Sequence, residues 1–157
     1  MDLAAHTVPD TETSGRRRCA GLLAGAMLIE LHSAWDALTD KPEAKPVRGP
    51  ETGLVMVRGR IGGGGSPFNL GEATVTRATI ALASGTIGHA QALGTDKKKV
   101  RLAAIFDALW QEEATRDAIE STLLTPVEMR IATQDKAKAE ETAATRVDFF
   151  TMVRGDD

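Results

Sequence analysis

The chain has 157 residues, with 19 Lys and Arg against 22 Asp and Glu, a formal net charge of −3 at pH 7, and 42% hydrophobic residues. These values are typical of a folded globular domain, and they exclude collagen-like, disordered and mini-protein classes. The one cysteine, Cys19, excludes an internal disulfide and a cysteine-based zinc cluster. We therefore expect a protein of the reducing cytoplasm.

The longest apolar run, residues 20–31, contains two glycines and the charged Glu30. It is shorter than the roughly 20 apolar residues that span a bilayer. An acidic, polar decapeptide precedes Arg16–Arg18, unlike the basic start of a signal peptide. We expect neither a transmembrane helix nor secretion, and we assign the run to an amphipathic first helix.

Charge is unevenly distributed along the chain. From Ala44 to Arg101 there are nine basic and three acidic residues, whereas the remaining residues carry ten basic and nineteen acidic ones. A basic centre in an acidic protein favours an anionic ligand or an acidic partner surface. The basic residues are not interleaved with aromatic ones and the chain has no Tyr, so we expect no nucleic-acid partner.

The first third of the chain predicts helices. Residues 1–14 have no periodicity and are expected to form a flexible tail, followed by a single domain over residues 15–157. Apolar residues at helical spacing over 15–38 predict two helices joined near Gly25. Residues 39–50 contain three prolines and are expected to be a connection.

The hydrophobic period then changes from 3.6 to 2, which indicates strands. The predicted strands are residues 53–61, 70–83 and 86–93. Ser84-Gly85 is expected to be a two-residue turn that places Ile80 opposite His89 in an antiparallel meander.

Helices follow the strands. A helix capped by Asp96 is predicted after Gly94, then a break at Pro126, then a solvated helix over Val127–Ala144 and a closing strand over Val147–Val153. Helices and strands are segregated, so the predicted fold class is α+β: an antiparallel meander covered on one face by helices, with N-terminal helices and a C-terminal strand.

Four consecutive glycines, Gly62, Gly63, Gly64 and Gly65, form the most unusual motif. Such a loop exposes backbone N–H groups that can bind an anion. No Lys-Ser or Lys-Thr follows, and Ser66-Pro67 leads into a strand, so the loop does not match a Walker or Rossmann site. A flexible hairpin loop without a ligand is the alternative.

Three arginines, Arg58, Arg60 and Arg77, lie on neighbouring predicted strands. Guanidinium groups bind phosphate and carboxylate oxygens in bidentate fashion, so these residues are candidates for an anion site. The alternative is a solvated sheet face, or ion pairs with Glu51 and Glu72.

His89 shares a strand face with Ile87 and Leu93. It is either a half-buried histidine with its hydrogen bonds satisfied or a general acid or base. His6 and His32 have no metal-ligand spacing around them, so we expect no metal site.

The C-terminal segment is apolar on both predicted strand faces, with Phe149 and Val153 on one and Phe150 and Met152 on the other. A terminal strand of this kind is either central in its own sheet or inserted against another chain. The two interpretations remain open.

Three stretches together resemble the PhnG family, subunits of the bacterial carbon-phosphorus lyase system: residues 51–77 with their Arg-Gly-Arg glycine loop, Gly85-Thr-Ile-Gly-His89, and Arg146–Asp156. The resemblance implies a subunit that acts with the H, I and J subunits in a core complex. It also implies that the G, H and I subunits, with the L subunit, replace the adenine of ATP by an alkylphosphonate, giving a ribose alkylphosphonate triphosphate.

The resemblance further implies that this chain binds no cofactor by itself. ATP is the substrate of the complex, an iron-sulfur cluster and S-adenosylmethionine belong to the J subunit, and the nucleosidase chemistry belongs chiefly to the I subunit. The residues expected to bind anions or partners are Arg58, Arg60, Gly62, Gly63, Gly64, Gly65, Arg77 and His89, and those expected at a partner interface are Phe149, Phe150, Met152 and Arg154. A purely structural subunit without substrate contact is the alternative.

Overall fold

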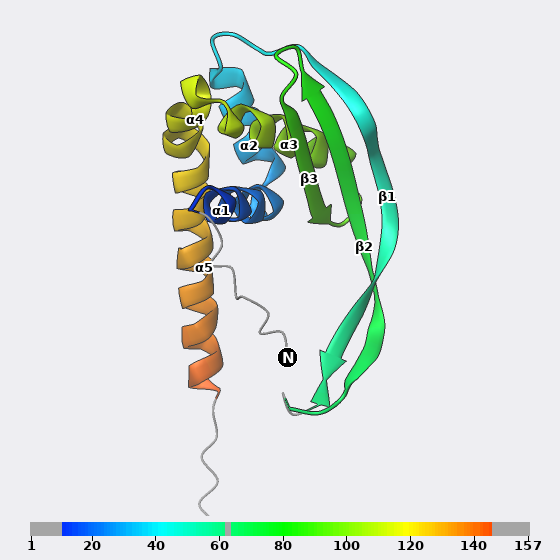
Figure 1. The fold of residues 1–157 in the computed structure, drawn as a ribbon. Helices are drawn as coiled ribbons and strands as arrows, with labels where there is room; N and C mark the ends of the chain where they lie inside the picture. Colours follow the sequence, from blue (N-terminus) through cyan, green and yellow to red (C-terminus); the bar gives the residue numbers. More distant parts are fainter. Residues whose placement is uncertain (1–10, 62–63, 146–157) are drawn as a thin grey trace, which may run out of the picture.

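The computed structural model describes residues 11–61 and 64–145 (Figure 1). Its elements are α1 (Thr11–Gly25), α2 (Leu28–Ala37), β1 (Ala44–Arg60), β2 (Pro67–Leu82), β3 (Ile87–Leu93), α3 (Lys97–Gln111), α4 (Glu113–Ile119), the π-helix η2 (Glu120–Leu124) and α5 (Thr125–Ala144). The sheet has the antiparallel order β1-β2-β3, and the helices lie on one side of it. The α+β meander with N-terminal helices is thus confirmed, while the predicted C-terminal strand lies outside the described residues.

Two expectations about prolines were wrong. Residues 44–50 belong to β1 rather than to a connection. An edge strand tolerates proline because one row of its N–H groups has no partner in the sheet, and β1 is such a strand. Pro126 causes no break, because it lies in the first turn of α5, where its missing N–H is not needed.

At the other end of the chain, α1 begins at Thr11, inside the segment expected to be a tail.

The β2–β3 turn has three residues instead of the expected two. The N–H of Leu82 donates to the carbonyl of Thr86 at 3.0 Å, and the N–H of Gly85 donates to the carbonyl of Leu82 at 2.9 Å. Gly85 has a φ of +93°, as such loops require at their last position. Thr79, and not Ile80, therefore lies opposite His89. The expected register was wrong by one residue, and a shift of one residue exchanges the two faces of a strand.

The core lies between the sheet and α3. The inward side chains of β2 are buried, namely Thr76, Ala78, Ile80 and Leu82. They pack with Phe106 and its neighbours on α3, which begins as predicted at Asp96, whose side chain accepts from the N–H of Lys99 at 2.9 Å. Gly88 of β3 faces α3 so closely that an added Cβ would overlap the carbonyl oxygen of Ala104. This contact sets the distance between β3 and α3.

Asp107 is a buried carboxylate, 1% exposed, on α3. Its Oδ2 accepts from the Arg16 guanidinium of α1 at 3.0 Å and from the backbone N–H of His89 at 2.8 Å. The side chain of Gln111 donates to the same oxygen at 3.4 Å and to the carbonyl of Ile87 at 2.9 Å. Asp107 thereby joins α1 and β3 to α3.

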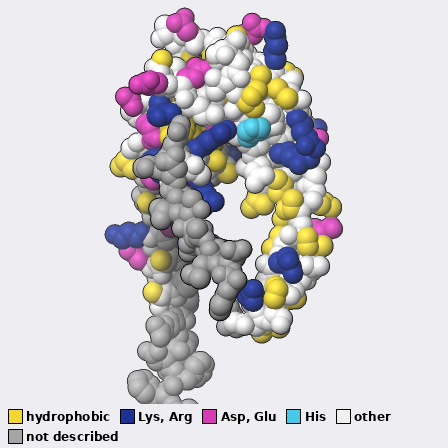
Figure 2. Space-filling model, in the orientation of Figure 1, with side chains coloured by type: hydrophobic (Ala, Val, Ile, Leu, Met, Phe, Trp, Pro, Cys, Tyr) yellow, Lys and Arg dark blue, Asp and Glu magenta, His cyan; other side chains and the backbone are white. Residues whose placement is uncertain are grey.

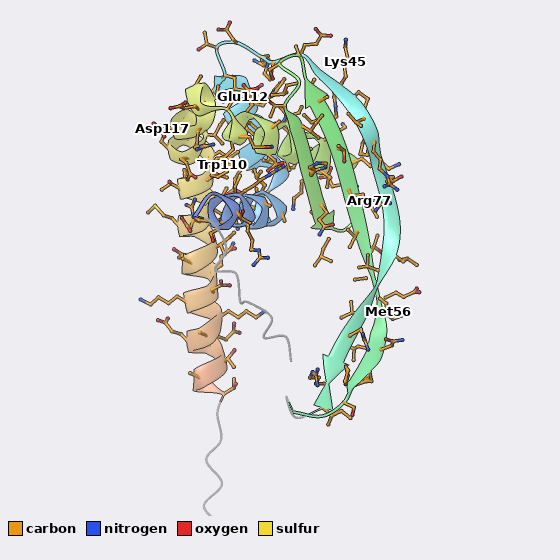
Figure 3. All side chains as sticks on the ribbon, viewed as in Figure 1. Lys45, Met56, Arg77, Trp110, Glu112 and Asp117 are labelled. Atoms are coloured by element: carbon orange, nitrogen blue, oxygen red, sulfur yellow. The ribbon has the colours of Figure 1, made fainter. Side chains whose placement is uncertain are left out.

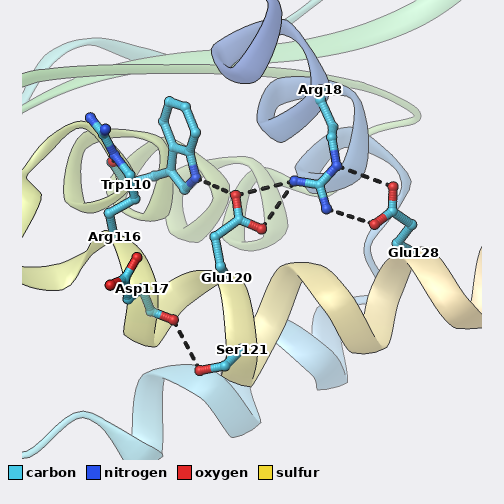
Figure 4. Close-up of polar contacts among 7 residues, drawn as sticks. All are labelled: Arg18, Trp110, Arg116, Asp117, Glu120, Ser121 and Glu128. Atoms are coloured by element: carbon cyan, nitrogen blue, oxygen red, sulfur yellow. Dashed lines mark hydrogen bonds and ion pairs between the residues drawn. The ribbon is translucent and has the colours of Figure 1, made fainter. Parts of the chain in front are cut away.

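A second polar cluster joins α1 to the C-terminal helices (Figure 4). Arg18 of α1 forms ion pairs with Glu120 at 3.0 Å and with Glu128 at 2.6 Å. The indole N–H of Trp110 donates to Glu120 at 2.7 Å. The hydrogen bond from Arg18 is the main cause that lowers the pKa of Glu128, so this carboxylate stays ionised at neutral pH.

We expect Gly88→Ala to lower the free energy of unfolding by about 3 kcal/mol or more, because the new methyl group meets helix backbone that cannot move aside. Gly71→Ala is the matched control, since a Cβ at that exposed strand position meets nothing within 4 Å. Urea denaturation of both variants measures the difference. Equal stability of the two variants would contradict the close approach.

Asp107→Ala is expected to cost about 2 to 3 kcal/mol of stability, because it leaves the His89 N–H and the Arg16 guanidinium without their acceptor. Arg16→Gln should cost less, because the Arg16 side chain is 40% exposed and Asp107 keeps its hydrogen bonds from the His89 N–H and from Gln111. Thermal and urea unfolding compare the two. A larger loss from the Arg16 variant would show that Asp107 is not the centre of the network.

Candidate functional site

The predicted site residues lie in two separate places along the β1–β2 pair. Arg77 lies in the three-stranded part of the sheet, directly opposite Glu51, whereas Arg58 and Arg60 lie near the end of β1. The seven steps along β1 from Glu51 to Arg58, at about 3.3 Å per residue, place Arg58 roughly 20 Å from Arg77. The three arginines therefore do not form one cluster.

Two adjacent rows of residues cross all three strands and form a feature that we call the cross-strand patch. One row consists of Glu51, Arg77 and Gln91. The other consists of Arg48, Thr79 and His89. Arg77 and Thr79 alternate with the buried Thr76, Ala78 and Ile80, so the patch lies on the face turned away from the core. The observed register places His89 on the same face as Arg77.

Glu51 lies between two guanidinium groups of the patch. Nε of Arg77 donates to Oε1 of Glu51 at 2.7 Å, and Nε of Arg48 lies 2.8 Å from the same oxygen. The hydrogen bond from Arg77 is the main cause that lowers the pKa of Glu51, and Arg48 adds to it. The carboxylate is thus ionised at neutral pH, and these three groups together carry one net positive charge.

An open hollow of about 650 Å³ adjoins the patch. Its walls come from the patch residues Arg48, Arg77, Thr79, His89 and Gln91, and from Ala20, Gly21 and Ala24 of α1 with Ala78 and Ala90. His89 is exposed rather than half-buried, and its Nδ1 lies 3.0 Å from Oγ1 of Thr79. Figure 2 shows Lys and Arg side chains on both sides of a histidine on the face in view. Guanidinium, imidazole and amide groups around one hollow can hold a phosphate-like or carboxylate anion.

Beyond the last β3 pair, β1 and β2 continue as a two-stranded arm (Figure 1), which we define as Leu54–Arg60 with Pro67–Thr74. Its large apolar side chains are between 38% and 66% exposed: Leu54, Val55, Met56, Val57, Phe68 and Leu70. Consecutive residues point to opposite faces of a strand, so both faces of the arm are apolar. Figure 3 shows Met56 on the arm, well separated from Arg77.

The tip of the arm contains the glycine run, of which Gly62 and Gly63 lie outside the described residues. Gly65 donates its N–H to the carbonyl of Ile61 at 3.2 Å, and a Cβ on Gly65 would lie 2.9 Å from that oxygen. Nη1 of Arg60 donates to the carbonyl of Gly65 at 2.9 Å. In this arrangement Arg60 stabilises the turn, and anion binding by the loop stays a prediction.

The sequence reasoning missed Arg48, because the prolines around it indicated a connection instead of a strand. It also missed a second hollow of about 680 Å³ between α1 and α4, whose basic residues are Arg16, Arg17 and Arg116. The run of three arginines at 16–18 was a signal for it. The predicted interface residues Phe149, Phe150, Met152 and Arg154 lie outside the described residues.

Within residues 11–61 and 64–145 no group of His, Cys, Asp or Glu is arranged to hold a metal ion. None of the helices in the same ranges is long and apolar enough to cross a membrane.

Comparison with known proteins extends the resemblance to almost the whole chain. The family model described as phosphonate metabolism protein PhnG matches residues 14–155. The alpha-D-ribose 1-methylphosphonate 5-triphosphate synthase subunit PhnG of Rhizobium meliloti (strain 1021) is 64% identical over 154 residues, which cover 98% of each chain. The match includes the N-terminal helices, where no motif had indicated a relationship. This chain belongs to the PhnG family of phosphonate metabolism proteins.

Proposed function

We propose that this chain is an accessory subunit of an α-D-ribose 1-methylphosphonate 5-triphosphate synthase within a carbon-phosphorus lyase complex. In the proposed reaction an oxygen of the alkylphosphonate bonds to C1′ of ATP while the bond from C1′ to adenine breaks. The proton lost by the phosphonate leaves with adenine. The similarity to the Rhizobium meliloti subunit supports this assignment.

The arm is the observation that carries the proposal. A two-stranded hairpin without a covering layer is at best marginally stable in water. This arm exposes apolar side chains on both faces, such as Leu54 at 63% and Leu70 at 66%. Contiguous exposed apolar surface of this kind marks a protein interface. We therefore assign the arm to contact with other subunits of the complex, for which the H, I, J and L subunits are the proposed partners.

The catalytic groups are proposed to lie on those partner subunits. The patch contains one carboxylate, and Glu51 is already held by Arg77 and Arg48. Within the described residues the imidazole of His89 forms a hydrogen bond with Thr79, whereas the imidazole of a nucleophile-activating histidine is oriented by a carboxylate. ATP is then a substrate of the complex, and the iron-sulfur cluster and S-adenosylmethionine belong to a partner.

The cross-strand patch is proposed to help hold an anion of this reaction. A substitution at C1′ passes through a sugar cation-like state, in which two anionic groups must be kept in position. The observation in favour is that Arg77 and Arg48 both contact one oxygen of Glu51, so their guanidinium groups can approach a single oxyanion together. His89 borders the same hollow.

A purely structural subunit is the second candidate. The observation in its favour is that Glu51 occupies the position between the two guanidinium groups, so the patch is already satisfied internally. In that case the patch holds β1 to β2 and touches no substrate.

Replacement of Leu54 and Met56 by Asp is expected to abolish assembly, because two charges cannot be buried in an apolar interface without partners. Asn69→Asp is the matched control, since it adds a charge to the same arm at an exposed polar position. Co-expression with the H, I and J subunits and the mass of the purified assembly give the result. Normal assembly of the double variant would exclude the arm as the contact surface.

Arg77→Ala is expected to leave assembly intact and to lower kcat/KM for adenine release roughly tenfold, since one charge-assisted hydrogen bond to an anion is lost. Glu51→Gln should act in the opposite direction and lower KM, because it releases both guanidinium groups for the substrate. Arg101→Ala, an exposed arginine on α3, is the control. Unchanged kinetics in both patch variants would favour the purely structural subunit.

A further inference from the structure

The hollow of about 680 Å³ between α1 and α4 is basic and is separate from the cross-strand patch. Its volume lies within the roughly 300 to 1,000 Å³ of small-molecule sites. One wall is a single face of α1, because Thr13, Arg16, Arg17 and Ala20 follow one another at helical spacing. Arg116 of α4 adds a third guanidinium group, and no acidic residue of the described chain lines the hollow.

The guanidinium group of Arg116 is held in place before any ligand arrives. Its Nε donates to the carbonyl of Trp110 at 2.9 Å, and its Nη2 donates to the carbonyl of Gln111 at 3.2 Å. Its central carbon lies 4.8 Å from the centroid of the Trp110 ring, and Figure 4 shows the two side chains next to each other. These contacts use Nε and one terminal nitrogen, which leaves Nη1 for another acceptor. Because the group is already ordered, binding an anion costs little further conformational entropy.

Arg16 is held in the same way from the other side chain of the pair it forms with Asp107. Its Nε and Nη2 lie 3.4 Å and 3.0 Å from the two oxygens of Asp107, so its Nη1 is also left for another acceptor. The Arg16 side chain is 40% exposed although its carboxylate partner is buried. A ligand in the hollow can therefore reach Arg16 without breaking the contact with Asp107.

The carboxylates beside the hollow do not neutralise it. Asp107 is held by Arg16, and Glu112 accepts from the hydroxyl groups of Ser84 and Thr86. Among the described residues, no ion pair joins Arg17 or Arg116 to a carboxylate. The cross-strand patch differs in this respect, because Glu51 already lies between its two guanidinium groups. Three guanidinium groups against two carboxylates leave one net positive charge here.

We propose that this hollow binds a phosphate-type anion through Arg16, Arg17 and Arg116. A phosphate group carries a charge of about −1.5 to −2 at pH 7 and offers three strong acceptor oxygens. Guanidinium groups match such oxygens better than other basic side chains do. The anion is either inorganic phosphate or the phosphate of a larger molecule. The site shares only Ala20 with the hollow beside the patch, and it does not depend on the proposed function.

NMR titration of the isolated full-length chain tests the proposal without any other subunit. The chain has two tryptophans, of which Trp110 lines the hollow and Trp35 does not. At constant ionic strength, inorganic phosphate or tripolyphosphate is expected to shift the indole N–H signal of Trp110 in a saturable manner and to leave that of Trp35 in place. Tenfold tighter binding of tripolyphosphate would indicate a larger phosphorylated ligand, and equal binding would indicate free phosphate. No saturable shift with either anion, or the same shift with chloride, would overturn the proposal.

Substitutions assign the response to the hollow. Arg17→Gln is expected to raise the Kd of the better-binding anion about tenfold, because one charge-assisted hydrogen bond is lost. Arg17 is exposed, so this change should not disturb the fold. Arg116→Gln should weaken binding by at least as much, and an unchanged Trp35 signal shows that this variant is folded. Arg77→Gln, in the patch, is the matched control and should keep the parent Kd. An unchanged Kd in the Arg17 variant, or an equal loss in the Arg77 variant, would overturn the assignment.

Discussion

The body of the protein depends on the buried carboxylate of Asp107, because three elements bring donors to it. Arg16 comes from α1, the backbone N–H comes from His89 on β3, and Gln111 comes from the next turn of α3. A carboxyl group buried in the interior is stable only when such donors surround it. The same bonds hold α1 against β3, and α1 supplies one wall of the hollow beside the cross-strand patch. The side chains of Asp107 and Gln111 also occupy two backbone groups at the outer edge of β3, the His89 N–H and the Ile87 carbonyl.

The three-stranded part of the sheet is buried on one face and the arm is exposed, because the helices cover only the three-stranded part. Along β2, every second side chain from Thr76 to Leu82 is buried against α3, whereas from Pro67 to Glu72 all are exposed. The arm thus continues the same two strands without a covering layer. Natural sheets usually protect such ribbons with charged residues or prolines, yet the run from Leu54 to Val57 contains neither. The absence of protection is the physical reason to assign this surface to a permanent contact.

The sequence predicted the elements well and the site only in part. Local signals such as the cap at Asp96 and the change of hydrophobic period placed α3 and the sheet correctly. The register of β2 with β3 could not be predicted. The sequence around Ser84-Gly85 is compatible with both a two-residue and a three-residue turn, although the two turns differ in geometry. That one-residue difference decides whether His89 lies beside Arg77. Arg48 was missed because proline is read as a break, although an edge strand accepts it.

Assembly and anion holding need not compete for the same residues. The arm begins at Leu54, three residues along β1 from Glu51 of the patch, and the pairing of β1 with β2 from Glu51 to Leu54 is regular. A subunit that holds the arm would therefore fix the direction in which Arg77 and His89 point, because β1 and β2 run continuously paired from the arm to the patch. Under the proposed function, the patch presents its hollow to a neighbouring active site only after the arm has been covered. On that proposal this chain would serve the reaction by positioning the patch, while the catalytic groups lie on the proposed partner subunits.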